Sequence, residues 1–154
     1  MMNDAEFESF ANHCNKLLED TNDKKPSSEE ADNESFGWFA IPNSSWRDEN
    51  FLYDYGWGNG YVVVPYGEPL WGVEYEELDG LCETYKGFTY SSEDTHLKNR
   101  KGVPQWVKDS DWIVGFDTAH GGDNQETCPK DLVVFYAVKA AKDLYAINEK
   151  RKEG

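Results

Sequence analysis

Residues 112–123, WIVGFDTAHGGD, are the stretch from which the fold can be worked out. Trp112–Phe116 form an apolar run that is typical of a buried strand. The run turns polar at Asp117 and then reaches Gly121 and Gly122, where the backbone can curve tightly. The sequence therefore predicts a buried strand that leads into a glycine-rich polar loop, and this loop is the first candidate for a functional site.

Apolar runs on both sides of this segment predict further elements. Residues 36–41 (FGWFAI), 60–65 (GYVVVP) and 84–90 (TYKGFTY) predict strands, and the run of valines indicates burial on both faces of one of them. Residues 129–151 predict a helix. Its apolar side chains recur at steps of three and four, at Leu132, Val133, Tyr136, Ala140, Leu144 and Ile147. A strand over 132–138 would also suit the β-branched residues, but it leaves the later periodicity unexplained.

The first 35 residues differ from the rest of the chain. Residues 3–20 predict an amphipathic helix, which either packs on the domain or binds a partner. Residues 21–35 contain a single aliphatic side chain, Ala31, and predict a polar acidic linker. The predicted organisation is thus an N-terminal helix (1–20), a linker (21–35) and one core domain (36–154).

The order of these elements predicts the fold class. A helix is followed by several strands and a second helix, without the alternating rhythm of parallel α/β proteins. An α+β fold is therefore expected, with a small mixed or antiparallel sheet, an N-terminal helix and a C-terminal helix. The 154 residues suit one domain with a modest core, to which the 15% of aromatic residues contribute large buried areas.

Negative charge is concentrated in one part of the sequence. The chain has 30 acidic and 15 basic residues, and residues 48–85 contain no base at all. Such a surface repels nucleic acid and favours a basic protein partner. It is either a solvated face that keeps the protein in solution or a decoy that occupies a nucleic-acid-binding protein. The candidate binding acids in this stretch are Glu68, Glu74, Glu76, Glu77 and Asp79.

Several classes of protein are disfavoured by what the sequence lacks. Its three cysteines are widely spaced, which argues against a disulfide framework and against a structural zinc site. Neither a signal peptide nor an apolar run of about 18 residues is found. Phosphate-loop, dinucleotide-binding and H-E-x-x-H motifs are missing too. A soluble cytoplasmic protein without a membrane partner is predicted.

Asp117, His120 and Asp123 form the one constellation that could carry chemistry. An aspartate can orient an imidazole, which can then act as a base or bind a divalent metal, so His120 is the candidate metal ligand although no cofactor is predicted. The alternative is structural, because Asp and His at a strand end often bond to loop amides. Further candidate binding residues are Tyr85, Thr89 and Tyr90.

Four short motifs lie between residues 55 and 150: GYV at 60–62, GEP at 67–69, GFTYS at 87–91 and GFDTAHGGD at 115–123. In this order they resemble a family of small phage and prophage proteins. The pattern of that family reads G-Y-V, G-H-P, H-G-G-L-T-[YF]-S and G-F-D-x-A-H-x-G-D before a final helix. The last motif is intact, whereas Glu68 replaces one family histidine and Tyr85-Lys86 stand where the family has His-Gly. With two of three histidines absent, the resemblance implies binding or a structural turn rather than catalysis.

Three hypotheses follow from these observations. The first is a phage-type accessory protein that binds and inhibits a host defence or nucleic-acid-processing protein, as anti-CRISPR-like inhibitors do. The second is a small hydrolase, or a nucleotide- or metal-binding domain, centred on Asp117, His120 and Asp123. The third is that the Asp117–Asp123 motif is a packed structural turn. Binding is favoured over catalysis.

Overall fold

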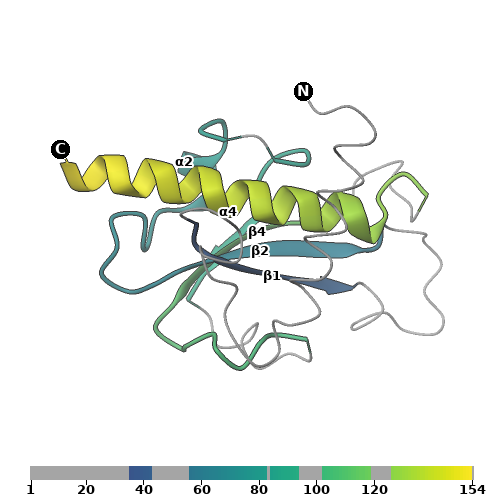
Figure 1. Cartoon of the computed structure of the whole chain (residues 1–154), viewed down its shortest axis with the longest axis horizontal. Coiled ribbons are helices and arrows are strands. Elements are labelled where there is room, and N and C mark those ends of the chain that lie inside the picture. Colours follow the sequence, from purple (N-terminus) through teal and green to yellow (C-terminus); the bar gives the residue numbers. More distant parts are fainter. Residues whose placement is uncertain (1–34, 43–55, 83, 94–101, 119–125, 154) are drawn as a thin grey trace.

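A four-stranded antiparallel sheet forms the centre of the molecule, with strand order β1-β2-β4-β3 (Figure 1). The computed structural model describes residues 35–42, 56–82, 84–93, 102–118 and 126–153. The strands are β1 (Gly37–Pro42), β2 (Gly58–Val64), β3 (Tyr90–Ser92) and β4 (Trp112–Phe116), and the helices are α2 (Tyr75–Leu78) and α4 (Lys130–Glu153). The predicted α+β class, with an antiparallel sheet and a helix after the strands, is confirmed.

β2 is a central strand that is buried on both faces. It pairs with β1 on one side and with β4 on the other, and every one of its residues is buried. Val62 and Val64 face the core beneath α4, whereas Val63 faces a second core with Phe39 and Ile113. The prediction that the valines are buried on both faces is therefore confirmed.

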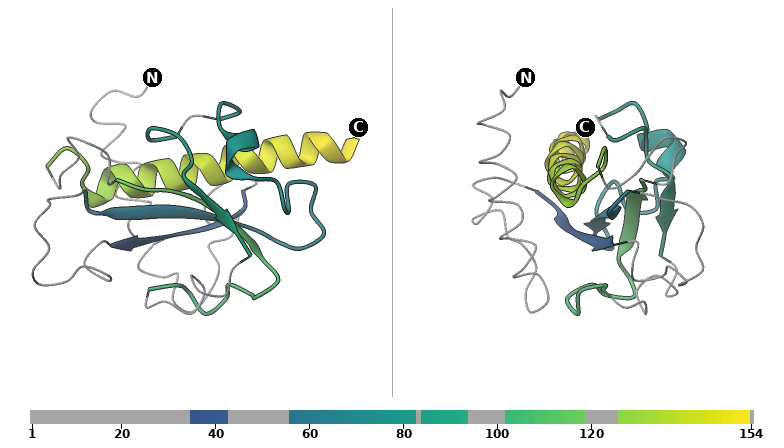
Figure 2. Two further views of the ribbon diagram at one scale, coloured as in Figure 1. Left: turned by 180° about the vertical axis from the view of Figure 1, so that it is seen from behind. Right: turned by 90° about the vertical axis from the view of Figure 1, so that its right-hand side faces the viewer.

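The two cores are covered by different parts of the chain. On one face α4 runs along the sheet, as both views in Figure 2 show. On the other face the rings of Phe39 and Tyr61 stack with centroids 4.9 Å apart. Val103, Trp106 and Val107, from the connection that precedes β4, pack against this second core. The fold is thus a sheet between a helix and an irregular connection.

The predicted helix over 129–151 is confirmed as α4, but its buried face is rotated from the predicted one. Leu132, Tyr136 and Ile147 are only half-buried. The fully buried side chains are Val133, Val134, Ala137, Val138, Ala140, Ala141, Leu144 and Asn148. Small side chains form much of this stripe, because they let the helix backbone approach the sheet more closely than Leu or Tyr would.

The predicted strand over 84–90 is wrong, since β3 begins only at Tyr90. Lys86 and Gly87 have φ angles of 58° and 92°, which lie in the left-handed region and not in the β region. The backbone N–H of Phe88 donates to the Asp79 carboxylate, at 3.3 Å, instead of to a neighbouring strand. A turn that is fixed by Asp79 therefore replaces most of the predicted strand.

The strands predicted around 36–41, 60–65 and 111–117 are confirmed as β1, β2 and β4, with ends that differ by one or two residues. The short helix α2 was not among the predicted elements. The predicted helix over 3–20 and almost all of the predicted linker over 21–35 lie outside the described residues, so they stay predictions. None of the helices described here is long and apolar enough to cross a membrane.

Candidate functional site

The residues at the end of β4 are held in place by hydrogen bonds to the start of β2. Thr118 is fully buried, and its hydroxyl donates to the Gly58 carbonyl oxygen at 2.7 Å. The Thr118 carbonyl in turn accepts from the Gly56 N–H at 2.9 Å. Asp117, the first residue after β4, is half-buried. The base of the predicted polar loop is therefore fixed by structural contacts.

Tyr85 and Cys128 meet at this same end of the sheet. The thiol of Cys128 is fully buried and donates to the Tyr85 hydroxyl oxygen, with sulfur and oxygen 2.9 Å apart. The Cys128 carbonyl accepts from the Trp57 N–H at 2.8 Å. A side chain at Gly56 would collide with Thr118 and with the Cys128 Cβ, so only glycine fits there. Tyr85 thus acts as a packing and hydrogen-bonding residue at the start of α4.

The other two members of the D-x-x-H-x-x-D constellation, His120 and Asp123, lie outside the described residues. The same is true of His13 and His96. Among the residues that the structure describes, no three His, Cys, Asp or Glu side chains are grouped so that they could hold a metal ion. The predicted chemistry of Asp117, His120 and Asp123 therefore stays a prediction.

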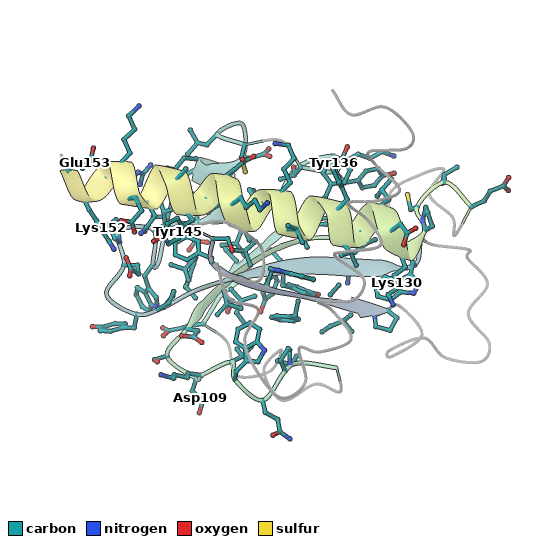
Figure 3. All side chains as sticks on the ribbon, viewed as in Figure 1. Asp109, Lys130, Tyr136, Tyr145, Lys152 and Glu153 are labelled. Atoms are coloured by element: carbon teal, nitrogen blue, oxygen red, sulfur yellow. The ribbon has the colours of Figure 1, made fainter. Side chains whose placement is uncertain are left out.

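Glu68 lies at the opposite end of the molecule from Thr118. Its carboxylate oxygen Oε2 accepts from the Asn148 amide and from the Lys152 ammonium, each at 2.9 Å. The hydrogen bonds with Glu68, and then with Glu149, raise the pKa of Lys152 above its usual value. Figure 3 shows Lys130 and Lys152 near opposite ends of α4, a separation of about 33 Å along a helix. Glu68 therefore cannot share one site with Asp117.

Asn148 completes this second network and was not predicted from the sequence. It is fully buried, and its Oδ1 atom accepts from the Leu70 N–H at 3.0 Å while its amide nitrogen donates to Glu68. The network ties the turn after β2 to the last turns of α4. A signal was present in the sequence, because Asn148 continues the buried stripe after Ala141 and Leu144.

The candidate acids around α2 take different roles. Glu74 accepts from the Ser91 hydroxyl at 2.8 Å, and Ser91 accepts from the Tyr75 N–H at 3.0 Å, so Glu74 helps to join α2 to β3. Asp79 accepts from the Phe88 N–H, as described above. Glu76 and Glu77 are exposed on α2 itself. All four of these acids come from the long connection between β2 and β3.

Two large hydrophobic side chains are exposed on this same connection. Tyr66 is 71% exposed and Leu81 is 47% exposed, and the structure shows no other large hydrophobic side chain as exposed among the described residues. We call residues 65–82 the acidic connection, since they contain Glu68, Glu74, Glu76, Glu77 and Asp79 and no basic residue. Exposed apolar groups and a sequence rich in carboxylates therefore occur together on this connection.

Cys82, at the end of the acidic connection, is not an activated nucleophile. Burial, followed by the negative charge of Asp143, raises the pKa of the Cys82 thiol to about 12. The nearby cation Lys139 lowers it by less than these effects raise it. The thiol is therefore protonated at neutral pH, and a protonated thiol is a poor nucleophile.

The last two candidates, Thr89 and Tyr90, line the edge of the sheet next to β4. The Thr89 N–H donates to the Gly115 carbonyl at 2.9 Å, and Tyr90 pairs with Gly115 in the register of β3 and β4. The Tyr90 ring lies edge-to-face with Tyr61, with centroids 6.1 Å apart. Tyr90 therefore belongs to the second core, whereas the Thr89 side chain is exposed.

The structure thus divides the predicted site residues into three groups. Asp117 and Tyr85 lie near the start of α4, and Thr89 and Tyr90 lie at the edge of the sheet next to β4. The five acids lie on the acidic connection, where Glu68 is also tied to the far end of α4. Comparison with known proteins adds no further assignment: no protein-family model, no curated protein and no solved structure matches the chain.

Proposed function

We propose that the protein acts by binding a basic protein partner through the acidic connection, residues 65–82. One observation carries the proposal. Both exposed large hydrophobic side chains of the described residues, Tyr66 and Leu81, lie on the acidic connection, which has five carboxylates and no basic residue. Protein interfaces combine apolar anchors with a polar rim, and charge complementarity speeds the encounter of the two partners.

A basic partner fits this surface better than nucleic acid does. The net charge of −15 disfavours the approach of phosphates, and the acidic connection has no basic residue to bind them, whereas its carboxylates would attract a cationic binding groove. We therefore propose a phage-type accessory protein that occupies the groove of a host defence or nucleic-acid-processing protein and excludes its nucleic acid. The predicted motifs of residues 115–123 would then contribute to the fold rather than to a reaction.

The test is a competition experiment with purified basic nucleic-acid enzymes of host defence systems. The protein should displace a fluorescent oligonucleotide from its target enzyme, and the apparent affinity should fall as salt is added. The variant Glu76→Lys/Glu77→Lys should lose the displacement. The control variant Glu126→Lys/Glu153→Lys changes the net charge equally, at exposed positions outside the acidic connection. It should keep most of the ability to displace the oligonucleotide.

Two results would count against the proposal. One is displacement that both double variants lose to the same extent, because the location of the charge would then not matter. The other is the absence of salt-sensitive binding to any enzyme of the panel. If Asp117→Ala and His120→Ala abolish a biological activity while the acidic variants keep it, the second hypothesis, a reaction or ligand site at Asp117–Asp123, takes its place.

A further inference from the structure

Tyr66 is an exposed ring that packs against a partly buried indole. Its ring meets that of Trp71 edge-to-face, with centroids 5.0 Å apart and an interplanar angle of 79°. Trp71 in turn packs against Trp112, with centroids 5.6 Å apart. Tyr66 is thus the outermost ring of a stack of three whose innermost member, Trp112, belongs to β4 and is only 8% exposed.

The two indole rings of this aromatic stack each donate a hydrogen bond to a backbone carbonyl. The indole N–H of Trp71 donates to the Ser110 carbonyl at 2.8 Å, and that of Trp112 donates to the Val73 carbonyl at 2.9 Å. The turn after β2 is also tied to α4 through Glu68 and Asn148. Because both indoles are already positioned, a partner that docks on Tyr66 loses little further conformational freedom of this surface.

The acidic composition of residues 65–82 favours a cation as the group that docks on the Tyr66 ring. A cation is attracted to the face of an aromatic ring, and the planar guanidinium of arginine also stacks on it. The ammonium of lysine is compact and strongly hydrated, so it gains less from the ring. Glu76 and Glu77, ten and eleven residues further along the same connection, are also exposed.

We infer that the partner presents an arginine side chain whose guanidinium stacks on the Tyr66 ring, while neighbouring basic residues of the partner face Glu76 and Glu77. This inference rests on the proposed function, since it names the chemistry by which the acidic connection would recognise its partner. Tyr66 then supplies selectivity for arginine, and the carboxylates supply attraction to any cation.

The experiment compares two peptides of equal charge, nona-arginine and nona-lysine, by isothermal titration at physiological ionic strength. Nona-arginine should bind the native protein about fivefold more tightly than nona-lysine, the order expected for one cation–π contact. The preference should persist in Tyr66→Phe, which keeps the ring, and should shrink in Tyr66→Leu. Glu76→Gln/Glu77→Gln should weaken both peptides by a similar factor. Circular dichroism checks that each variant is folded.

The possible outcomes separate the inference from the proposed function. Equal affinity for the two peptides, or an arginine preference that survives unchanged in Tyr66→Leu, overturns the role of Tyr66 but leaves the acidic connection as a binding surface. If neither peptide binds, the proposed function itself fails at this connection. Loss of the preference in Tyr66→Leu, together with its retention in Tyr66→Phe, supports the inference.

Discussion

At the scale of single residues, two buried asparagines illustrate opposite uses of an amide. Asn148 is satisfied at both ends, by Leu70 and Glu68. Asn59 donates from its amide nitrogen to the Tyr61 hydroxyl at 3.3 Å, but its buried Oδ1 atom has no hydrogen-bond partner among the described residues. An unpaired buried acceptor costs about 1–3 kcal/mol, so the two amides should contribute to stability with opposite sign.

We therefore predict opposite effects for the same substitution at these two positions. Asn59→Leu should raise the free energy of unfolding by about 1 kcal/mol, because it removes the unpaired acceptor and adds apolar area to the second core. Asn148→Leu should lower it by about 2–3 kcal/mol, because it leaves the buried Leu70 N–H without an acceptor. Urea denaturation of both variants measures the difference. A loss of stability of equal size in both would contradict this account of Asn59.

At the scale of elements, the contact between the end of β4 and the start of β2 shows how a side chain can fix the position of a strand end. Thr118 follows β4 by two residues and reaches back to the Gly58 carbonyl at the start of β2. The backbone pairing of β2 with β4 ends at Gly60 and Phe116. Beyond this pair, the Thr118 hydroxyl supplies the hydrogen bond between the two segments. Thr118, which follows the predicted catalytic residue Asp117, thus has a structural role.

We predict that Thr118→Val, which keeps the shape of the side chain, lowers the free energy of unfolding by about 1–2 kcal/mol, because the Gly58 carbonyl loses its donor. Thr89→Val is the matched control. The Thr89 side chain is exposed, and the bond from its backbone N–H to the Gly115 carbonyl is kept in the variant, so the effect should stay within about 0.5 kcal/mol. Thermal denaturation measures the midpoints of the two variants. Equal midpoints would mean that the hydrogen bond from Thr118 to Gly58 does not stabilise the fold.

The same scale shows what sequence patterns could and could not predict. Periodicity and apolar runs were sufficient for β1, β2, β4 and α4, because burial alone selects those residues. The strand over 84–90 could not be excluded, since the left-handed turn at Lys86 and Gly87 depends on a contact with Asp79. The exact buried face of α4 also depended on which side chains were small enough for close packing.

The candidate site was less predictable than the fold for a related reason. The contact between Tyr85 and Cys128 joins residues far apart in the sequence, and neither residue type signals a partner of the other kind. The acids of residues 48–85 were recognised from composition, but composition could not separate the exposed Glu76 and Glu77 from Glu68, which is tied to α4. Only the three-dimensional arrangement distinguishes structural from exposed carboxylates.

At the scale of the whole molecule, net charge is the dominant property. The chain carries a formal charge of −15 on 154 residues. Like charges repel one another more strongly in the compact state than in the unfolded chain, so such an excess opposes folding. Dissolved salt screens this repulsion, with a Debye length of about 10 Å at 0.1 M ionic strength.

We predict that the melting temperature rises as sodium chloride is increased from low to physiological ionic strength. Differential scanning calorimetry measures the shift, and potassium chloride in place of sodium chloride should give the same rise if screening is the cause. A melting temperature that falls with salt would mean that attractive ion pairs such as Glu68–Lys152 outweigh the general repulsion.

The position of α4 in the chain has a consequence for biosynthesis. The helix covers one face of the sheet, yet it is made after all four strands. While the ribosome is still adding Lys130–Glu153, the strands already synthesised expose Val62, Val64 and Val114 with nothing from α4 to shield them. Nascent chains with such surfaces are prone to aggregation, so this protein should depend on a chaperone, or on rapid translation of α4, until the helix covers the sheet.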